Sequence, residues 1–157
     1  MRHTISVLVE NKFGVLARVS GLFSARGYNI SSLAVSETLD PDVSYMTIVV
    51  DAKDEAVLEQ IKKQLNKLID IIKVTDFTRK EHVERELILV KVSCNAKNKA
   101  KIKALVDKHE GAVIQCKNDT AIIEAVGEQA AIKQLLDNLD TFGVKELVRT
   151  GKIAVAY

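Results

Sequence analysis

One order of predicted elements, strand-helix-strand-strand-helix-strand, occurs twice in this sequence, and the repetition limits the possible folds more than any other feature. The first copy begins with the alternating strand TISVLV, residues 4–9. A helix follows, in which apolar side chains recur at helical spacing through VLARVSGLF. A hairpin over residues 30–51, a second helix that opens at Asp54 and Glu55, and the strand DIIKVTDF complete this copy.

The second copy follows a polar connector. The strand RELILVKVSC leads into a helix over residues 98–109, then a hairpin that turns at Asn118–Asp119, a fourth helix, and the β segment VKELVRTGKIAVAY, broken near Gly151. This order predicts an α+β chain of two βαββαβ ferredoxin-like units, each an antiparallel sheet with both helices on one face. Such small units leave the other sheet face and at least one edge uncovered, which favours pairing with another copy. The predicted boundaries are residues 1–78, a connector at 79–84, and residues 85–157.

Composition excludes several classes of function. The sequence is 47% hydrophobic and 28% charged, as in globular proteins, and no apolar run approaches the ~20 residues of a membrane-spanning helix. The N-terminus enters a strand directly, so we expect a cytoplasmic protein without a membrane partner. The 23 basic and 21 acidic residues interleave, and only 4% of residues are aromatic. We therefore expect no nucleic-acid partner, RNA included.

The sequence contains no convincing catalytic constellation. His3, His82 and His109 lie near a terminus, in the connector and late in a charged helix, and we interpret them as solvated surface residues. Cys94 and Cys116 form no CxxC pair and are interpreted as small hydrophobic side chains on strands. No phosphate-binding loop, dinucleotide-binding glycine pattern or serine elbow occurs. The expectation is no catalytic residue, no metal site and no cofactor.

The two turns that flank the first helix form the remaining candidate site. They carry Asn11 with Gly14, and Gly27 with Asn29. A helix N-terminus presents unpaired N–H groups that suit a carboxylate, and Gly14 would let a small ligand approach the backbone. The two asparagines offer donors and acceptors to an amino acid. A structural role explains the residues equally well, with Asn11 as a helix cap and Gly14 in a tight turn.

The segment ENKFGVLARVSGLFSARGYNISSL resembles the opening of the regulatory small subunit of acetohydroxyacid synthase, also called acetolactate synthase. The similarity continues through DPDVSYMTIVV, QLNKLIDIIKV and VERELILVKV, and returns in GVKELVRTGKIA. Residues 95–140 fit mainly by pattern. The resemblance implies that residues 1–78 form an ACT domain, a βαββαβ amino-acid sensor that binds an effector and dimerises.

By this resemblance the chain is a regulatory subunit without catalytic activity. The implied partner is the large subunit, which carries thiamine diphosphate, and usually FAD and magnesium, and condenses two 2-keto acids. The small subunit would activate it and confer feedback inhibition by valine, or a related amino acid, in branched-chain amino-acid biosynthesis. Two ACT domains would pair edge to edge as a homodimer, with the effector between them. The implied effector-binding residues are Asn11, Gly14, Val15 and Leu16 of one domain, and Asn29 and Ile30 of the facing domain.

Each of these residues has an expected role in that site. Asn11 and Asn29 would make polar contacts to the amino acid, and the backbone from Gly14 to Leu16 would hold its carboxylate. Apolar side chains would take the isopropyl group. Valine, isoleucine and leucine differ by one methylene or its branching, worth only about 1–3 kcal/mol, so the sequence does not identify the effector.

Two alternatives stay open at this point. The chain could be a free-standing ACT-type sensor that serves another enzyme or a transcription system. It could instead be a small enzyme on a ferredoxin-like scaffold. Co-purification with a large thiamine-dependent subunit would separate the first alternative from the regulatory subunit, and turnover by the isolated chain would support the second.

Overall fold

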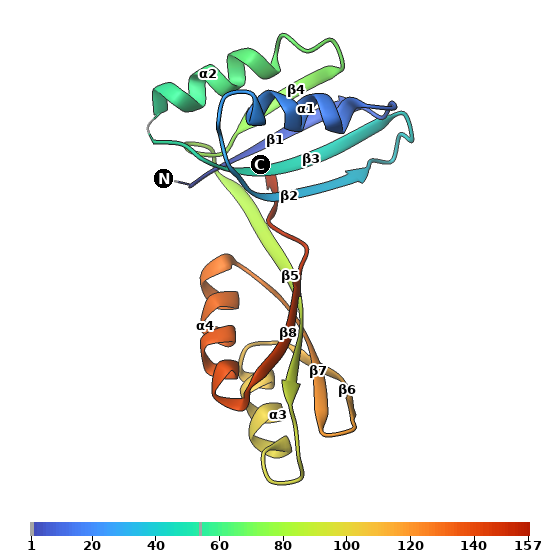
Figure 1. Cartoon of the computed structure of the whole chain (residues 1–157), viewed down its shortest axis with the longest axis vertical. Helices are drawn as coiled ribbons and strands as arrows, with labels where there is room; N and C mark the ends of the chain where they lie inside the picture. The colour runs from blue at the N-terminus through green and yellow to red at the C-terminus, as the bar shows by residue number, and fades with distance from the viewer. Residues whose placement is uncertain (1, 54) are drawn as a thin grey trace. The chain divides into compact units, whose positions relative to one another are not determined.

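The computed structural model describes residues 2–53 and 55–157. The chain divides into two compact units, one formed by the residues up to Val83 together with Lys152–Tyr157 and one formed by Glu84–Gly151. The elements, labelled in Figure 1, are β1 (Arg2–Glu10), α1 (Val15–Ser24), β2 (Ile30–Glu37), β3 (Val43–Asp51), α2 (Glu55–Leu65), β4 (Ile71–Asp76), β5 (His82–Ser93), α3 (Lys99–Lys108), β6 (Ala112–Lys117), β7 (Thr120–Gly127), α4 (Gln129–Leu139), the 3-10 turn η1 (Asp140–Phe142), β8 (Val144–Arg149) and β9 (Ile153–Ala156).

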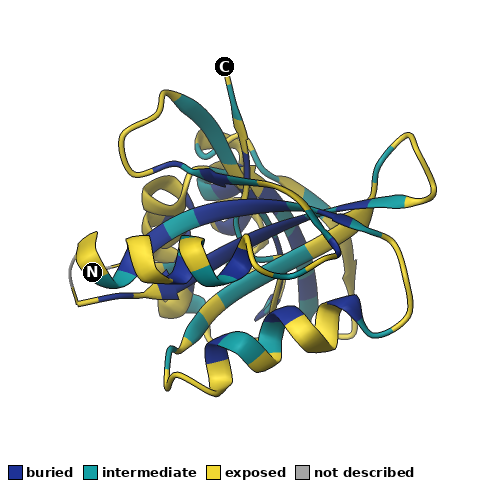
Figure 2. Cartoon of the chain, turned by 90° about the horizontal axis from the view of Figure 1, so that it is seen from above, coloured by how far each residue is buried: buried dark blue, intermediate teal, exposed yellow. Residues whose placement is uncertain are grey.

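The first unit is an antiparallel sheet of order β2-β3-β1-β4 with α1 and α2 on one face (Figure 1). Side chains alternate between the two faces of a strand, so every second residue of β1 and β3 points towards the helices. Figure 2 shows the buried positions on the strands and on the inward sides of the helices. The core of this unit contains Ile5, Val7, Val9, Val15, Val19, Phe23, Met46, Ile48, Val50, Leu58, Ile61 and Leu65.

The second unit repeats the arrangement with strand order β6-β7-β5-β8, and α3 and α4 pack on one face. Its β6–β7 hairpin turns at Asn118 and Asp119, which have φ angles of 52° and 54°. Two successive left-handed residues are typical of the tight hairpin turn that matches strand twist. The predicted α+β class and the two βαββαβ ferredoxin-like units are confirmed. The core of this unit is formed by Ile88, Val90, Val92, Cys94, Ile102, Val106, Ala121, Ile123, Ala125, Ile132, Leu135 and Leu139.

Several element boundaries differ from the expected ones. β5 begins at His82, so part of the stretch 79–84 predicted as a connector is strand. Helical spacing in the sequence predicts Leu68 on the same helix as Leu65, but α2 ends at Leu65. Leu68 follows in a turn, and its N–H donates to the Leu65 carbonyl at 3.0 Å. Leu68 still packs on the core. The predicted helix start at Asp54 lies outside the described residues. In the parts of the chain that the structure describes, no helix is both long and apolar enough to cross a membrane.

The C-terminal segment Lys152–Tyr157 lies with the first unit, whereas the sequence pattern groups it with residues 85–151. The Lys152 amide donates to Ser32 Oγ at 3.0 Å, and Tyr45 Oη donates to the Ala154 carbonyl at 2.8 Å. β9 pairs with β5, and Figure 1 shows the end of the chain against the first sheet.

Small polar side chains let this segment lie close to the sheet. Ser6 and Thr47 face one another in the β1–β3 register, on the side away from the helices, and are only 3% and 1% exposed. Ala154 in β9 is buried as well. A sheet face that the sequence left uncovered is thus partly covered by the chain's own end.

Removing the Tyr45 hydroxyl should loosen the C-terminal segment. In Tyr45→Phe the Ala154 carbonyl loses its donor, so we expect local opening to become easier by about 1 kcal/mol. Hydrogen exchange at the end of the chain should then be roughly fivefold faster. Tyr28→Phe is the matched control, because the Tyr28 hydroxyl has no hydrogen-bond partner among the described residues. Equal exchange in wild type and Tyr45→Phe would contradict this role.

Candidate functional site

The turn between β1 and α1 depends on Gly14. This residue has a φ angle of +81°, in the left-handed region that side chains disfavour. A Cβ atom at this position would also lie 3.1 Å from Arg18 Nη1. Gly14 therefore has the tight-turn role that the sequence suggested, and it leaves the start of α1 without a covering side chain.

Asn11 ties this turn to the β2–β3 connection and does not cap α1. Its Nδ2 donates to the Pro41 carbonyl at 2.8 Å and to Glu37 Oε1 at 3.3 Å, and its backbone N–H donates to the Asp42 carbonyl at 2.7 Å. The N-cap position is Gly14, where no side-chain hydrogen bond is made. The capping alternative for Asn11 is therefore wrong.

The first turn of α1 presents backbone donors. The Val15 amide donates to the Lys12 carbonyl at 3.3 Å, whereas the Leu16 and Ala17 amides have no hydrogen-bond partner among the described residues. Together with the helix dipole, such amides favour an anionic group. Of the two apolar residues predicted here, Val15 is only 3% exposed and packs in the core, while Leu16 is 45% exposed. The buried side chain of Val15 is thus closed to a ligand, and the available donors at this turn are the Leu16 and Ala17 amides.

An ion pair between Arg18 in α1 and Asp70, which precedes β4, connects this turn to the sheet. Arg18 Nε and Nη2 both lie 2.8 Å from Oδ2 of Asp70, and Asp70 is 7% exposed. The Asp70 carbonyl in turn accepts the Glu10 amide at 2.9 Å. The sequence analysis did not single out Arg18, Asp70 or Glu37. The strand order of the predicted fold was the available signal, because it brings the start of β4 and the end of β2 to the same end of the sheet as Asn11.

The second turn gathers polar groups around Asp51. Ser31 Oγ donates to Asp51 Oδ2 at 2.7 Å, Asn29 Nδ2 donates to the same oxygen at 3.5 Å, and Arg2 Nε lies 3.6 Å from Oδ1. The hydrogen bond from Ser31 is the main cause that holds the pKa of Asp51 below its ordinary value, with Asn29 and Arg2 adding to it. Ile30, the last predicted site residue, pairs with Val50 at the start of the edge strand β2.

The predicted site residues therefore form two groups at opposite ends of the first sheet. In the β1–β3 register Glu10 is opposite Val43 and Arg2 is opposite Asp51, eight residues apart. At about 3.4 Å per residue this separation is roughly 27 Å. Asn11, Gly14, Val15 and Leu16 belong to one end, and Asn29 and Ile30 to the other. One chain does not bring the two asparagines together.

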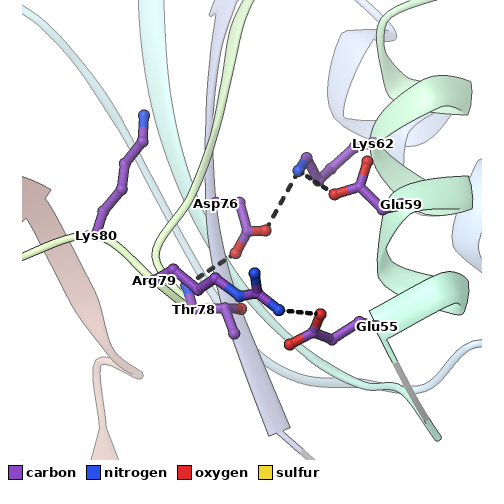
Figure 3. A pocket seen from close by; sticks show the side chains of 7 residues that line it. All are labelled: Glu55, Glu59, Lys62, Asp76, Thr78, Arg79 and Lys80. Carbon is purple, nitrogen blue, oxygen red and sulfur yellow. Dashed lines mark hydrogen bonds and ion pairs between the residues drawn. The ribbon is translucent and has the colours of Figure 1, made fainter.

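A separate cavity of about 270 Å³ lies between α2 and the segment that follows β4 (Figure 3). Most of its charged side chains pair with each other. Arg79 Nη2 is 2.6 Å from Glu55 Oε2, and Lys62 Nζ is 2.6 Å from Glu59 Oε1 and 3.3 Å from Asp76 Oδ2. No predicted site residue lines the cavity, which is bounded by Glu55, Glu59, Lys62, Asp76, Thr78, Arg79 and Lys80.

The pKa values in this cluster follow from the pairing. The hydrogen bond to Glu59 is the main cause that raises the pKa of Lys62. Burial is the largest single influence on Asp76 and acts to raise its pKa, but hydrogen bonds from Thr78 and Lys62 together hold that pKa below its ordinary value. The pairing therefore favours the charged forms of Lys62 and Asp76.

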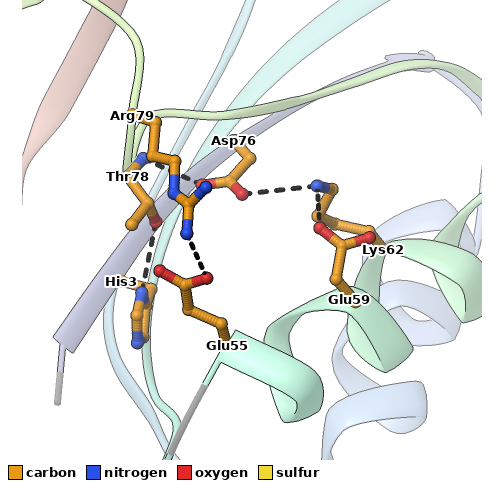
Figure 4. Close-up of polar contacts among 7 residues, drawn as sticks. All are labelled: His3, Glu55, Glu59, Lys62, Asp76, Thr78 and Arg79. Carbon is orange, nitrogen blue, oxygen red and sulfur yellow. Dashed lines mark hydrogen bonds and ion pairs between the residues drawn. The ribbon is translucent and has the colours of Figure 1, made fainter.

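His3 borders this cluster and is buried. Only 6% of His3 is exposed, and its Nδ1 lies 3.2 Å from Thr78 Oγ1 (Figure 4). The interpretation of His3 as a solvated residue is wrong, because the alternation of β1 turns its side chain to the helix face. Among the residues that the structure describes, no three histidine, cysteine or acidic side chains are grouped as a metal site would require.

The fold and the two turns define the class of the first unit. A βαββαβ unit of strand order β2-β3-β1-β4, with both helices on one face, has the ferredoxin-like topology that ACT domains share with other domains. Residues 5–73 match the family described as AHAS small subunit-like ACT domain, and residues 85–157 match the family described as small subunit of acetolactate synthase.

Individual relatives agree over the full chain. The acetolactate synthase small subunit of Mycolicibacterium smegmatis is 46% identical over 154 residues, 98% of this chain and 90% of that protein. The one of Aquifex aeolicus is 42% identical over 155 residues, 98% of this chain and 80% of that protein. The crystal structure of the Thermotoga maritima acetolactate synthase small subunit superposes with a TM-score of 0.90 at 37% identity, covering 100% of this chain and 98% of that one.

The chain belongs to the family of acetolactate synthase small subunits. It is the regulatory, non-catalytic kind of subunit in that enzyme. The family predicted from ENKFGVLARVSGLFSARGYNISSL is confirmed.

Ser31→Ala should raise the pKa of Asp51, because the mutation removes the hydrogen bond that contributes most to lowering it. A carboxylate whose folded-state pKa is depressed stabilises the fold above its unfolded pKa, and this contribution disappears as the pH falls through the folded-state pKa. The change should be measured as the carboxyl-carbon NMR titration of Asp51. Ser36→Ala is the control on the same strand, and an unchanged Asp51 titration in Ser31→Ala would contradict the assignment.

Proposed function

We propose that this chain binds the catalytic large subunit of acetolactate synthase in the cytoplasm, raises its activity, and makes it sensitive to valine or a related branched-chain amino acid. Membership of the small-subunit family supports the partner, because a small subunit is defined by the enzyme that it joins. The ACT-type first unit supports a small-molecule effector. The main structural support for the proposed effector site is that its two halves, residues 11–16 and residues 29–30, lie at opposite ends of one strand with an unpaired edge.

The strand is β2, which lies at one edge of the sheet of order β2-β3-β1-β4. Its outer N–H and C=O groups are suited to pairing with the same strand of a second copy. A twofold axis between Leu33 and Ala34 would place Ile30 of one chain opposite Glu37 of the partner subunit. Glu37 accepts a hydrogen bond from Asn11, so Asn29 of one chain would meet Asn11 of the other. A homodimer of this kind has two complete sites.

The chemistry of the two halves fits an α-amino acid. The free amides of Leu16 and Ala17 at the positive end of α1 suit the carboxylate. Each asparagine donates a hydrogen bond to a carboxylate, Asn11 to Glu37 and Asn29 to Asp51. These carboxylates can attract the ammonium group of the amino acid. The exposed Leu16 side chain offers an apolar surface to a branched side chain.

Such a site would regulate by changing the dimer. A ligand shared by two chains binds best when the chains hold it from both sides, so its binding free energy favours one dimer geometry. Inhibition follows if the large subunit prefers the other geometry, and the coupling is then reciprocal.

The test measures acetolactate formation by a purified cognate large subunit, with and without this chain, over separate titrations of valine, isoleucine and leucine. Activation by the chain together with inhibition by one of these amino acids is expected. Activation without inhibition would overturn the effector assignment and keep the partnership. Absence of both binding and activation would overturn the proposal.

Asn29→Ala should separate effector binding from partner binding. We expect the concentration of amino acid that gives half-inhibition to rise about tenfold, because one hydrogen bond of about 1.5 kcal/mol is lost, while activation persists. Asn66→Ala makes the same chemical change at an exposed position of the same domain and is the control.

Gly14→Asp should abolish inhibition through backbone strain and repulsion of the ligand carboxylate. Full amino-acid sensitivity in both Asn29→Ala and Gly14→Asp would contradict the proposed site.

A further inference from the structure

Two cysteines that lie 22 positions apart in the sequence meet in the second unit. Sγ of Cys94 and Sγ of Cys116 are 3.2 Å apart. Cys94 follows β5 and Cys116 is in β6. The β6–β7 hairpin brings them together, because Cys116 pairs with Ala121 and the Cys94 amide donates to the Asp119 carbonyl at 2.9 Å. Both cysteines are free thiols.

We propose that Cys94 and Cys116 are a site of reversible thiol oxidation, at which peroxide converts the two thiols into an intrachain disulfide. A disulfide bond is about 2.05 Å long, so the sulfur atoms need to approach by only roughly 1.2 Å. This pair was interpreted above as two small hydrophobic side chains on strands. That description fits the burial of Cys94 but not Cys116, which is exposed on an edge strand.

Because Cys116 is exposed and Cys94 is buried, Cys116 reacts with the peroxide first and Cys94 reacts second. The Cys116 thiolate attacks one oxygen of hydrogen peroxide, the O–O bond breaks, and the departing hydroxide takes up a proton as water. The product is a sulfenic acid. Cys94 sulfur then attacks Cys116 sulfur, the S–O bond breaks, and the hydroxide that leaves combines with the Cys94 proton. Two thiols and one peroxide give one disulfide and two waters.

Burial supports this division of roles. Cys94 is 3% exposed, and burial is the main cause that raises the pKa of its thiol, with the hydrogen bond to Cys116 adding to it. A buried, protonated thiol reacts poorly with an oxidant in solution. Cys94 is therefore the resolving cysteine, held in contact with the sulfur that oxidises first. Its position also protects Cys116 from further oxidation to the sulfinic acid.

The bond would cross-link a long stretch of the second unit. It would join the end of β5 to β6 and close a loop that contains α3, whose Ile102 and Val106 fill the core. Such a loop restricts the unfolded chain. We expect the thermal midpoint of the oxidised protein to rise by about 5–10 °C.

The experiment treats the full chain with hydrogen peroxide and follows thiol content, intact mass and non-reduced peptides. The expected result is simultaneous loss of both thiols, a mass lower by two hydrogen atoms, a peptide that joins Cys94 to Cys116, and reversal by dithiothreitol. Accumulation of oxygen atoms on Cys116 with Cys94 free would overturn the proposal. So would disulfide-linked dimers as the main product.

Cys116→Ser is the decisive control, because an exposed serine should not disturb the fold. In this variant Cys94 should stay unreactive towards peroxide in the folded protein, and treatment should leave the thermal midpoint unchanged. In Cys94→Ala, oxidation should continue on Cys116 to the sulfinic acid. If Cys94→Ala does not fold, Cys116→Ser and the wild-type peptide map still decide. These readouts do not depend on amino-acid binding or on the catalytic subunit.

Discussion

The first unit depends on the antiparallel register between β1 and β3, which runs without interruption from Arg2 opposite Asp51 to Glu10 opposite Val43. This register places alternate apolar residues under α1 and α2 and places Ser6 and Thr47 on the other side. A shift of one residue would exchange the two faces and bury hydroxyls against the helices. The same register determines which turns share an end of the sheet, so the core and the candidate site have a common origin.

That register also separates the two halves of the proposed effector site within one chain. Asn11 and Asn29 lie near opposite ends of the edge strand β2, and each donates a hydrogen bond to a carboxylate, Asn11 to Glu37 and Asn29 to Asp51. In the proposed homodimer, each half-site would be completed by the other half-site of the partner subunit. In the proposed dimer, effector binding and the choice of dimer geometry are then linked equilibria. Such linkage is the physical requirement for regulation at a distance.

The two units share one topology but differ in how far the sheet face opposite their helices is covered. In the first unit the C-terminal segment covers small polar side chains on this face. In the second unit β5, β7 and β8 leave Leu89, Val126 and Val148 exposed. Equivalent elements therefore carry different surfaces, and sequence similarity between the two halves would not have revealed this. The cysteine pair belongs to the second unit alone, where the hairpin at Asn118–Asp119 returns the chain to the end of β5.

Much of this protein followed from the sequence. Hydrophobic periodicity and turn residues are local properties, so the order of elements, the α+β class and the turns at Gly14, Gly27 and Asn118–Asp119 were predictable from short segments. The segment ENKFGVLARVSGLFSARGYNISSL was also sufficient to identify the family. Helical spacing did not show that Val15 faces the core while Leu16 is exposed. The predicted strand began at Thr4, so its alternation was not extended to His3, which is buried.

Tertiary structure alone decided which residues far apart in the chain meet. It directed the Asn11 side chain to Pro41 and Glu37, returned Lys152–Tyr157 to the first unit, and brought Cys94 to Cys116. These contacts depend on strand register, on the choice of edge strand and on the burial of many side chains at once. Local sequence patterns determine the elements, but such contacts are set by the free energy of the assembled core.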